Sequence, residues 1–332
     1  MVNRRVMMLG LAASAVSTAA ARSPGRIYRI GFFGFTAYNS PEDERIVAAF
    51  VGRLRELGFA EGKNLVIEWR YAEGRNERYA VFAKEMVGSR ADLIVTGTAT
   101  AAHAVVEASK TMPVVMFGMP DPVSTGLVTS LAHPGGQVTG MTNFSEDLVP
   151  KRIELFKSAV PSLARLAFAR CPECARLSGY SNAMLTALFD GYQTFAHKLG
   201  VALIEVPINS DSDFPAAVET LKRERADGVL LAANQINAKL RRDWIAFQSA
   251  ERIPVMSDYR ALGGLLAYGP DYAAIFRRVG EFAARILNGA NAGDLPMEQP
   301  TMVELVINRG VAKALGLTIP SSVLLRANLI LD

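Results

Sequence analysis

The chain has 332 residues, half of them hydrophobic and only 20% charged, so it is long enough for two domains and too apolar to be intrinsically disordered. Its formal net charge of +4 is small, and the basic residues are dispersed along the chain. This pattern argues against a nucleic-acid-binding surface.

The N-terminus has the layout of a secretory leader. Arg4 and Arg5 precede an uncharged apolar stretch over residues 6–21, which is shorter than the roughly 20 residues of a membrane-spanning helix. Residues 1–22 are therefore expected to be a signal peptide, exported by the general secretory or the twin-arginine route. Removal of residues 1–22, which include Arg4, Arg5 and Arg22, lowers the formal charge from +4 to +1, and the mature protein is predicted to be soluble in the periplasm.

The first half of the chain alternates buried strands with amphipathic helices. Residues 28–35 predict a strand, and 41–58 predict a helix because Ile46, Phe50 and Leu54 repeat on one face. Further strands are predicted over 65–72, 91–97, 113–118 and 138–143. Val/Ile-rich strands separated by helices indicate a parallel sheet covered on both faces.

The second half repeats this order. Its predicted strands cover 164–170, 201–208, 226–234 and 253–258. Segment 54–68 matches 196–205, and segment 91–100 matches 226–235, at similar offsets. The expected fold is therefore α/β, with two similar doubly wound parallel-sheet lobes around a central cleft.

Loops at the carboxyl ends of the strands are the expected binding surface, because ligands of open parallel sheets bind there. One such loop, Gly97-Thr98-Ala99-Thr100, lies directly before a predicted helix. It is either a plain helix cap or an anion site for a ligand carboxylate.

Other loop residues have side chains suited to a small polar or aromatic ligand. Aromatic rings stack on apolar or cationic groups, and carboxylates accept hydrogen bonds from amines. Asp121 and Asp271 are equally suited to capping the helices that follow them. The further candidate ligand-binding residues are Phe35, Tyr38, Gly118, Asp121, Asn143, Cys171, Tyr180, Asn234, Asp258, Tyr259, Tyr268 and Asp271.

Cys171 and Cys174 are the only cysteines and form a C-x-x-C pair. In an oxidising compartment a local disulfide is expected, while a role in ligand binding, free thiols or a metal are the alternatives. Zinc would need two more ligands, which the sequence does not place nearby. No catalytic motif is present, so we expect no enzyme activity, no cofactor and no metal.

Three blocks, over residues 71–79, 118–140 and 294–320, resemble the tryptophan/tyrosine-type substrate-binding proteins of bacterial ABC importers. The resemblance implies the type I periplasmic-binding fold, with three crossovers near residues 142–146, 266–270 and 298–302. The first lobe would then contain residues 27–144 and about 268–299, and the second 145–267 and about 300–332.

The resemblance also implies a function. The protein would capture a small molecule, an amino acid or a related carboxylate or aromatic compound, by lobe closure and deliver it, as a monomer, to an ABC transporter permease. Two alternatives are a ligand-sensing receptor for a membrane signalling partner and a two-lobed racemase. The racemase would need cysteines from opposite lobes, whereas these two lie close together in the sequence.

Overall fold

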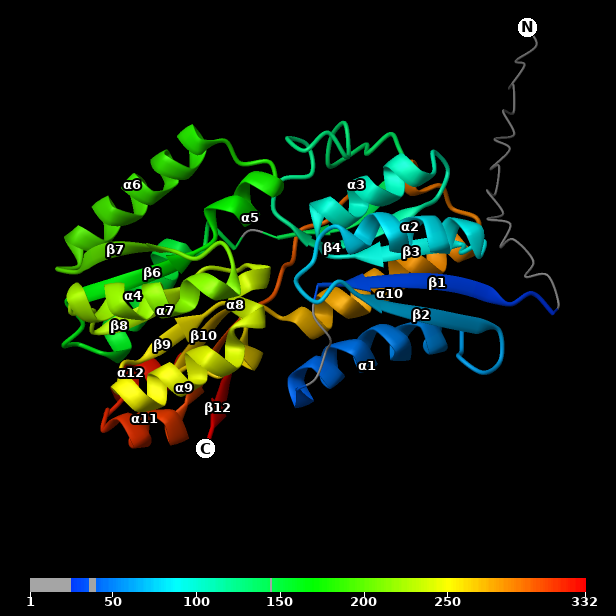
Figure 1. The fold of residues 1–332 in the computed structure, drawn as a ribbon. Coiled ribbons are helices and arrows are strands. Elements are labelled where there is room, and N and C mark those ends of the chain that lie inside the picture. The colour runs from blue at the N-terminus through cyan, green and yellow to red at the C-terminus, as the bar shows by residue number, and fades with distance from the viewer. Residues whose placement is uncertain (1–24, 36–39, 144) are drawn as a thin grey trace, which may run out of the picture.

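The computed structural model describes residues 25–35, 40–143 and 145–332, which form two α/β lobes joined by several chain crossings (Figure 1). The expected signal peptide and Tyr38 lie outside the described residues. Within the described part of the chain, no helix combines the length and apolar character needed to cross a membrane.

The first lobe is built on a five-stranded parallel sheet in the order β2-β1-β3-β4-β5. Four of these strands are fully or largely buried, as the continuous apolar runs predict, whereas the edge strand β2 is only partly buried. They are β1 (Tyr28–Gly34), β2 (Leu65–Tyr71), β3 (Leu93–Thr96), β4 (Val114–Met119) and β5 (Val138–Thr142).

Helices cover both faces of this sheet. On one face α1 packs against α10, a helix from far along the chain, and their apolar sides close one core around Phe32, Phe50 and Phe276. On the other face α2 packs against α3. These helices are α1 (Pro41–Glu56), α2 (Arg78–Gly88), α3 (Ala99–Ala108) and α10 (Tyr272–Leu287), and a short η3 (Ala292–Asp294) follows α10.

The second lobe has a seven-stranded sheet in the order β12-β11-β10-β9-β8-β6-β7. Neighbouring strands are parallel except β10 and β11, which are antiparallel. The strands are β6 (Arg165–Arg170), β7 (Ala202–Pro207), β8 (Gly228–Leu231), β9 (Val255–Ser257), β10 (Leu266–Pro270), β11 (Val303–Asn308) and β12 (Leu329–Leu331).

Two apolar clusters lie on opposite faces of this second sheet, one beneath α4 and α6 and the other around Trp244. The helices are α4 (Val149–Ala159), α5 (Pro172–Leu177), α6 (Asn182–Lys198), α7 (Phe214–Arg223), α8 (Gln235–Lys239), α9 (Arg241–Glu251), α11 (Arg309–Leu315) and α12 (Ser321–Leu324). Two 3₁₀ turns, η1 (Asp211–Asp213) and η2 (Arg260–Leu262), complete the lobe.

The two lobes repeat one topology, because β7-β6-β8-β9-β10 has the same order as β2-β1-β3-β4-β5. This is the doubly wound arrangement, in which the order reverses beside the first strand. The prediction of two similar parallel-sheet lobes is therefore confirmed, with a C-terminal pair of strands added to the second.

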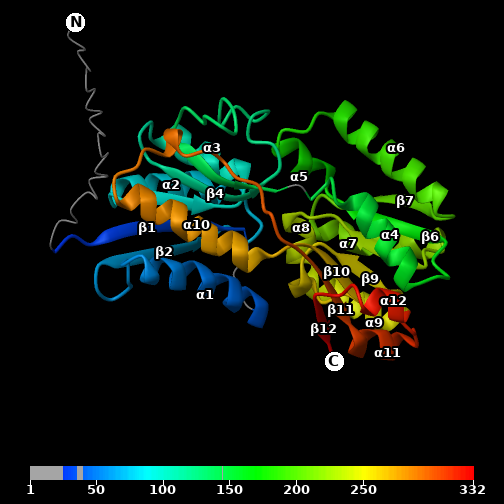
Figure 2. The same ribbon diagram turned by 180° about the vertical axis from the view of Figure 1, so that it is seen from behind.

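Three crossings join the lobes, after β5, after β10 and before β11. The first and third run side by side: the Thr142 amide donates to the Glu298 carbonyl over 2.7 Å, and the Glu298 amide donates to Gly140 over 2.9 Å. The third crossing is the orange segment that leads to β11 in Figure 2. The second crossing falls at Asp271, directly after the expected residues 266–270, because these form a full strand of the second sheet.

Candidate ligand-binding cleft

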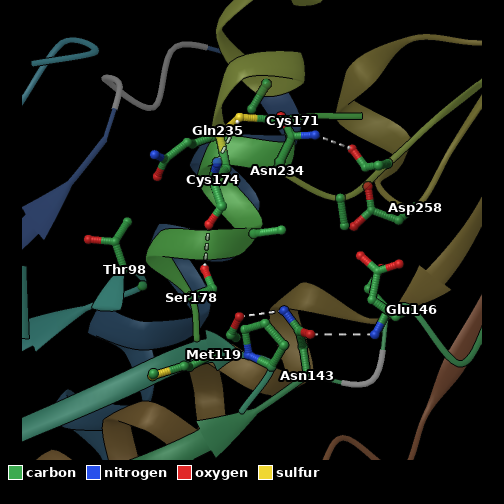
Figure 3. Close-up of a pocket in the computed structure, with 18 of the residues that line it drawn as sticks. Thr98, Met119, Asn143, Glu146, Cys171, Cys174, Ser178, Asn234, Gln235 and Asp258 are labelled. Carbon is green, nitrogen blue, oxygen red and sulfur yellow. Dashed lines mark hydrogen bonds between the residues drawn. A yellow bond between two sulfur atoms is a disulfide. The ribbon is translucent and has the colours of Figure 1, made fainter. Parts of the chain in front are cut away.

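A cavity of about 300 Å³ lies between the lobes, at the carboxyl ends of strands from both sheets (Figure 3). This volume is at the lower end of the range for small-molecule sites. The first lobe lines it with the loops after β1, β3 and β4, and the second with the loops after β6, β8 and β9. A ligand there would touch both lobes at once.

The loop after β3 forms one wall. Gly97 is required by packing, because a Cβ there would lie 2.4 Å from the Phe117 ring. Thr98 is the N-cap of α3, and its hydroxyl accepts a hydrogen bond from the Ala101 amide over 3.2 Å. The cap interpretation is therefore correct, but Thr98, Ala99 and Thr100 also line the cavity. The first amides of α3 thus border the space where an anion would lie.

The loop after β4 meets the first crossing. Gly118 has a φ of +85°, a conformation that favours glycine, and its carbonyl accepts a hydrogen bond from the Asn143 side chain. The Asn143 Oδ1 atom accepts a hydrogen bond from the Ser145 amide over 3.4 Å (Figure 3). Asn143 is therefore held between the two lobes, with its amide at the cavity wall.

The loop after β6 carries the cysteine pair, which is joined in a disulfide. Cys171 is the N-cap of the short helix α5, and Cys174, Ala175 and Ser178 of this segment line the cavity. The Ser178 hydroxyl donates to the Cys174 carbonyl over 2.9 Å. The disulfide is thus part of the cavity wall and fixes the first turn of α5.

Two carboxylates, Glu146 and Asp258, face the cavity from the second lobe (Figure 3). The Tyr192 hydroxyl donates to Glu146 Oε2 over 3.0 Å, and the Tyr272 hydroxyl donates to Asp258 Oδ2 over 3.0 Å. Burial raises the pKa of Glu146, and the nearby Asp258 carboxylate adds to that rise, although the Tyr192 hydroxyl, Arg152 and Arg170 oppose it.

The tyrosines beside these acids respond to the same environment. Burial raises the pKa of Tyr180 and of Tyr192 well above the ordinary tyrosine value, and the negative charge of Glu146 raises both further. Both phenols are therefore neutral hydrogen-bond donors or acceptors at physiological pH.

Arg170 is the one cationic side chain among the described residues that line the cavity, and it is already occupied. Its Nε donates to Glu205 Oε1 over 2.6 Å, and its guanidinium lies over the Phe189 ring at 5.2 Å. The rest of the wall is largely apolar. Phe117 and Phe276 are packed with their ring centres 4.8 Å apart, and Tyr259 and Tyr272 at 4.7 Å.

Most of the predicted site residues lie together at this cavity. They are Phe35, Gly97, Thr98, Ala99, Thr100, Gly118, Asn143, Cys171, Tyr180, Asn234, Asp258 and Tyr259. Whether each contacts a ligand remains a prediction.

Three predicted residues lie elsewhere. Tyr268 is inside β10, where it shares a face with Leu266 and packs on the second-lobe core, because alternate residues of a strand point to opposite sides. Asp271 caps α10, accepting from the Ala273 amide over 2.9 Å. The capping alternative is therefore correct for Asp271. It is wrong for Asp121, because the residues directly after it form turns and not a helix; Asp121 accepts from the Ser124 amide over 3.0 Å within this turn and lines a hollow beside the cavity.

Sequence reasoning missed Glu146, Arg170 and Tyr192. Glu146 follows β5 by four residues and lies inside the predicted first crossing. Since a crossing between the lobes borders the cleft, this position could have identified Glu146 as a candidate. Tyr192 is in the middle of α6, where the helical pattern predicts only core packing. Within the described ranges, no cluster of three or more metal-ligating side chains is present.

Two α/β lobes with a cavity between the carboxyl ends of their sheets define a solute-binding protein of the type I periplasmic fold. The sequence profile described as ABC transporter substrate binding protein matches residues 39–330. The chain belongs to this family, as its resemblance predicts.

Comparisons with individual relatives support this assignment to the family. The chain is 24% identical over 286 residues to a tyrosine-binding protein of Clostridioides difficile strain R20291, covering 83% of this chain and 78% of that one. A Streptococcus pneumoniae ABC domain in complex with L-Trp superimposes with a TM-score of 0.78 at 23% identity, over 92% of this chain and 100% of that one. The ligand-free, open structure of a substrate binding protein with adhesive properties from Clostridium difficile gives 0.63 at 24% identity, with the same coverage.

Proposed function

We propose that this protein is an exported periplasmic receptor that captures an amino acid with an aromatic or apolar side chain and delivers it to an ABC importer. The observation that carries the proposal is the cavity between the lobes, which both sheets line with their carboxyl-end loops. The ligands of two relatives, tyrosine and L-Trp, support this class of compound.

The wall chemistry matches a zwitterion with a ring. Glu146 and Asp258 are suited to an ammonium group, and the first amides of α3 are suited to a carboxylate. Phe33, Phe117 and Tyr259 provide apolar surface for a side chain. A micromolar dissociation constant corresponds to about −8 kcal/mol, which a few hydrogen bonds and one buried apolar group supply.

The proposed mechanism is capture without chemistry. The lobes rotate about the three crossings and close on the ligand, driven by its higher affinity for the closed form. Two features support a closed arrangement here: the higher TM-score to the L-Trp complex than to the open form, and ion pairs that span the lobes. The closed form would then be recognised by the permease.

The test is a thermal-shift screen of the mature protein against amino acids, nucleobases, vitamins and aromatic acids, with small-angle scattering on each hit. We expect an aromatic amino acid to raise the unfolding temperature and to reduce the radius of gyration at saturation. Unchanged scattering at saturation would contradict lobe closure, and absence of any amino-acid hit would contradict the ligand class.

A further inference from the structure

We propose that the cavity selects its ligand through a primary ammonium group held between Glu146 and Asp258, so that aromatic amines without a carboxylate are ligands too. This inference rests on the proposed function and names the part of the ligand that the receptor requires. The carboxylate of an amino acid is then a secondary contact.

The two acids form one binding position. Their carboxyl groups point toward each other on the same side of the pocket in Figure 3. Asp258 is 5% exposed, and only its Oδ2 atom has a hydrogen-bond donor, the Tyr272 hydroxyl, among the described residues. Two neighbouring carboxylates in a partly apolar cavity repel each other, and a cation between them removes the repulsion.

No protein cation occupies that position in the described part of the chain. Arg170 is paired with Glu205. Arg152 is 1% exposed, and each of its three guanidinium nitrogens donates to another partner: Nε to the Tyr268 carbonyl over 2.7 Å, and Nη1 and Nη2 to the Ser145 carbonyl and hydroxyl over 2.9 Å each. Among the described residues, neither Glu146 nor Asp258 forms an ion pair with a Lys or Arg nitrogen within 4.0 Å. Arg152 and Arg170 act on Glu146 only from a longer distance, which leaves the position between the two acids open to a ligand ammonium group.

The carboxylate of an amino-acid ligand would bind a weaker site than its ammonium group. A ligand carboxylate there would have the helix α3 N-terminus and the Thr98 hydroxyl, with no free Lys or Arg among the described lining residues. Contact of an anion with a helix N-terminus is worth about twofold to thirtyfold in affinity, which is less than the contribution of two buried carboxylates to the binding of an ammonium group.

The hollow beside the cavity is also lined by acidic side chains. Asp121, Asp147 and Glu146 line it together with Tyr180, and the negative charges of all three acids act on the Tyr180 phenol. Because Glu146 and Tyr180 line both spaces, the hollow adjoins the cavity on its acidic side. Negative potential at an approach route concentrates cations there.

The experiment compares three matched sets of probes by isothermal titration calorimetry: tryptophan, tryptamine and indole-3-propionate; tyrosine, tyramine and 3-(4-hydroxyphenyl)propionate; and phenylalanine, phenethylamine and 3-phenylpropionate. In the set whose ring fits, we expect the amine to bind within about tenfold of the amino acid. The acid that lacks the amine should bind at least about 100-fold more weakly.

Variants assign the effect to the acids. Glu146→Gln keeps an oxygen for the Tyr192 hydroxyl and Asp258→Asn keeps one for Tyr272, so each removes mainly charge. Each should weaken binding of the amine and the amino acid about tenfold or more, while Asp190→Asn, an exposed acid on α6, should change neither. If one variant fails to fold, the other variant and the probe series on the wild type still test whether the two acids bind the ammonium group.

The outcomes separate the two proposals. An acid that binds as tightly as its amino acid, or an amine that does not bind while its amino acid does, overturns this inference and leaves the receptor function standing. No binding by any of the three sets overturns both.

Discussion

Arg260 in the second lobe forms an ion pair with Glu42 of helix α1 in the first, with Nη2 and Oε2 2.6 Å apart and both side chains only 14% exposed. A second pair beside it joins Arg241 to Asp43 over 3.3 Å, and the Tyr259 hydroxyl donates to the same Asp43 over 3.2 Å. These contacts join the two lobes in this arrangement, so under the proposed closure mechanism they would stabilise the closed form.

Arg260→Ala should therefore weaken ligand binding even though Arg260 does not line the cavity. Loss of one partly buried, charge-assisted bond of about 1.5 kcal/mol lowers affinity about tenfold. Stopped-flow kinetics should show the change in the dissociation rate, with association almost unaltered. The matched control is Arg309→Ala, which removes an exposed pair with Asp332 inside one lobe. Equal affinities of wild type and Arg260→Ala would show that the pair does not contribute to closure.

Thr98→Val should lower the free energy of unfolding by about 1 kcal/mol, because the Ala101 amide loses its cap. Calorimetry should show affinity for an amino acid falling by less than about tenfold and affinity for the matching amine unchanged, since only the carboxylate meets α3. Thr98→Ser, which keeps the hydroxyl, should behave as wild type. An amino-acid affinity identical to wild type would remove this loop from the binding site.

The disulfide gives a third prediction. Thiol titration of the denatured mature protein should detect no free thiol before reduction and two after it, from Cys171 and Cys174. Replacing both with serine should cost about 2 kcal/mol of unfolding free energy or less, because the closed loop is short. Affinity should fall as well, since α5 forms part of the cavity wall. Reductant should lower the stability and the affinity of the wild type only. An equal effect of reductant on the double variant would contradict the role of the disulfide.

Glu146 should make the stability of the ligand-free protein depend on pH. Its pKa in the folded state is raised above the ordinary value of 4.5, mainly by burial, so the folded state holds a proton that the unfolded state releases. The contribution of this group to stability is therefore fully present below pH 4.5 and is lost as pH rises through the folded-state pKa.

Glu146→Gln removes that loss, because glutamine stays neutral. Thermal unfolding without ligand should show the variant more stable than wild type at pH 7.5, with the difference shrinking as the pH falls and disappearing below the ordinary carboxyl pKa of 4.5. Saturating amine ligand should reverse the order at pH 7.5, since only the ionised wild type pairs with the ammonium group. A difference between variant and wild type that is independent of pH would contradict this account.

Much of the fold was predictable because its signals are local. The strands over 65–72 and 226–234 are apolar runs flanked by turn residues, and the helix over 41–58 has a capping serine and a regular apolar face. The loops at strand ends, such as Gly97 to Thr100, were found for the same reason. Parallel sheets bring their carboxyl ends to one edge, so candidate loops follow from the strand positions alone.

The site was predictable only in part, because a side chain's direction and partners depend on contacts far along the chain. The sequence predicts Tyr268 to be a loop residue, but β10 pairs with β11, which holds Tyr268 inside the sheet. Asp258 was found from its loop, but its partner Glu146 lies more than a hundred residues earlier, in a crossing segment without a motif.

The sequence by itself determined the alternation of strands and helices, the repeat of one lobe in the other and the loops that carry polar groups, since these depend on local periodicity and chain propensity. Only the tertiary structure decided which charges meet: Glu146 with Asp258 at the cavity, and Arg260 with Glu42 across the lobes. The reason is that electrostatic interactions depend on distance and burial, and both are set by how the two lobes pack against each other.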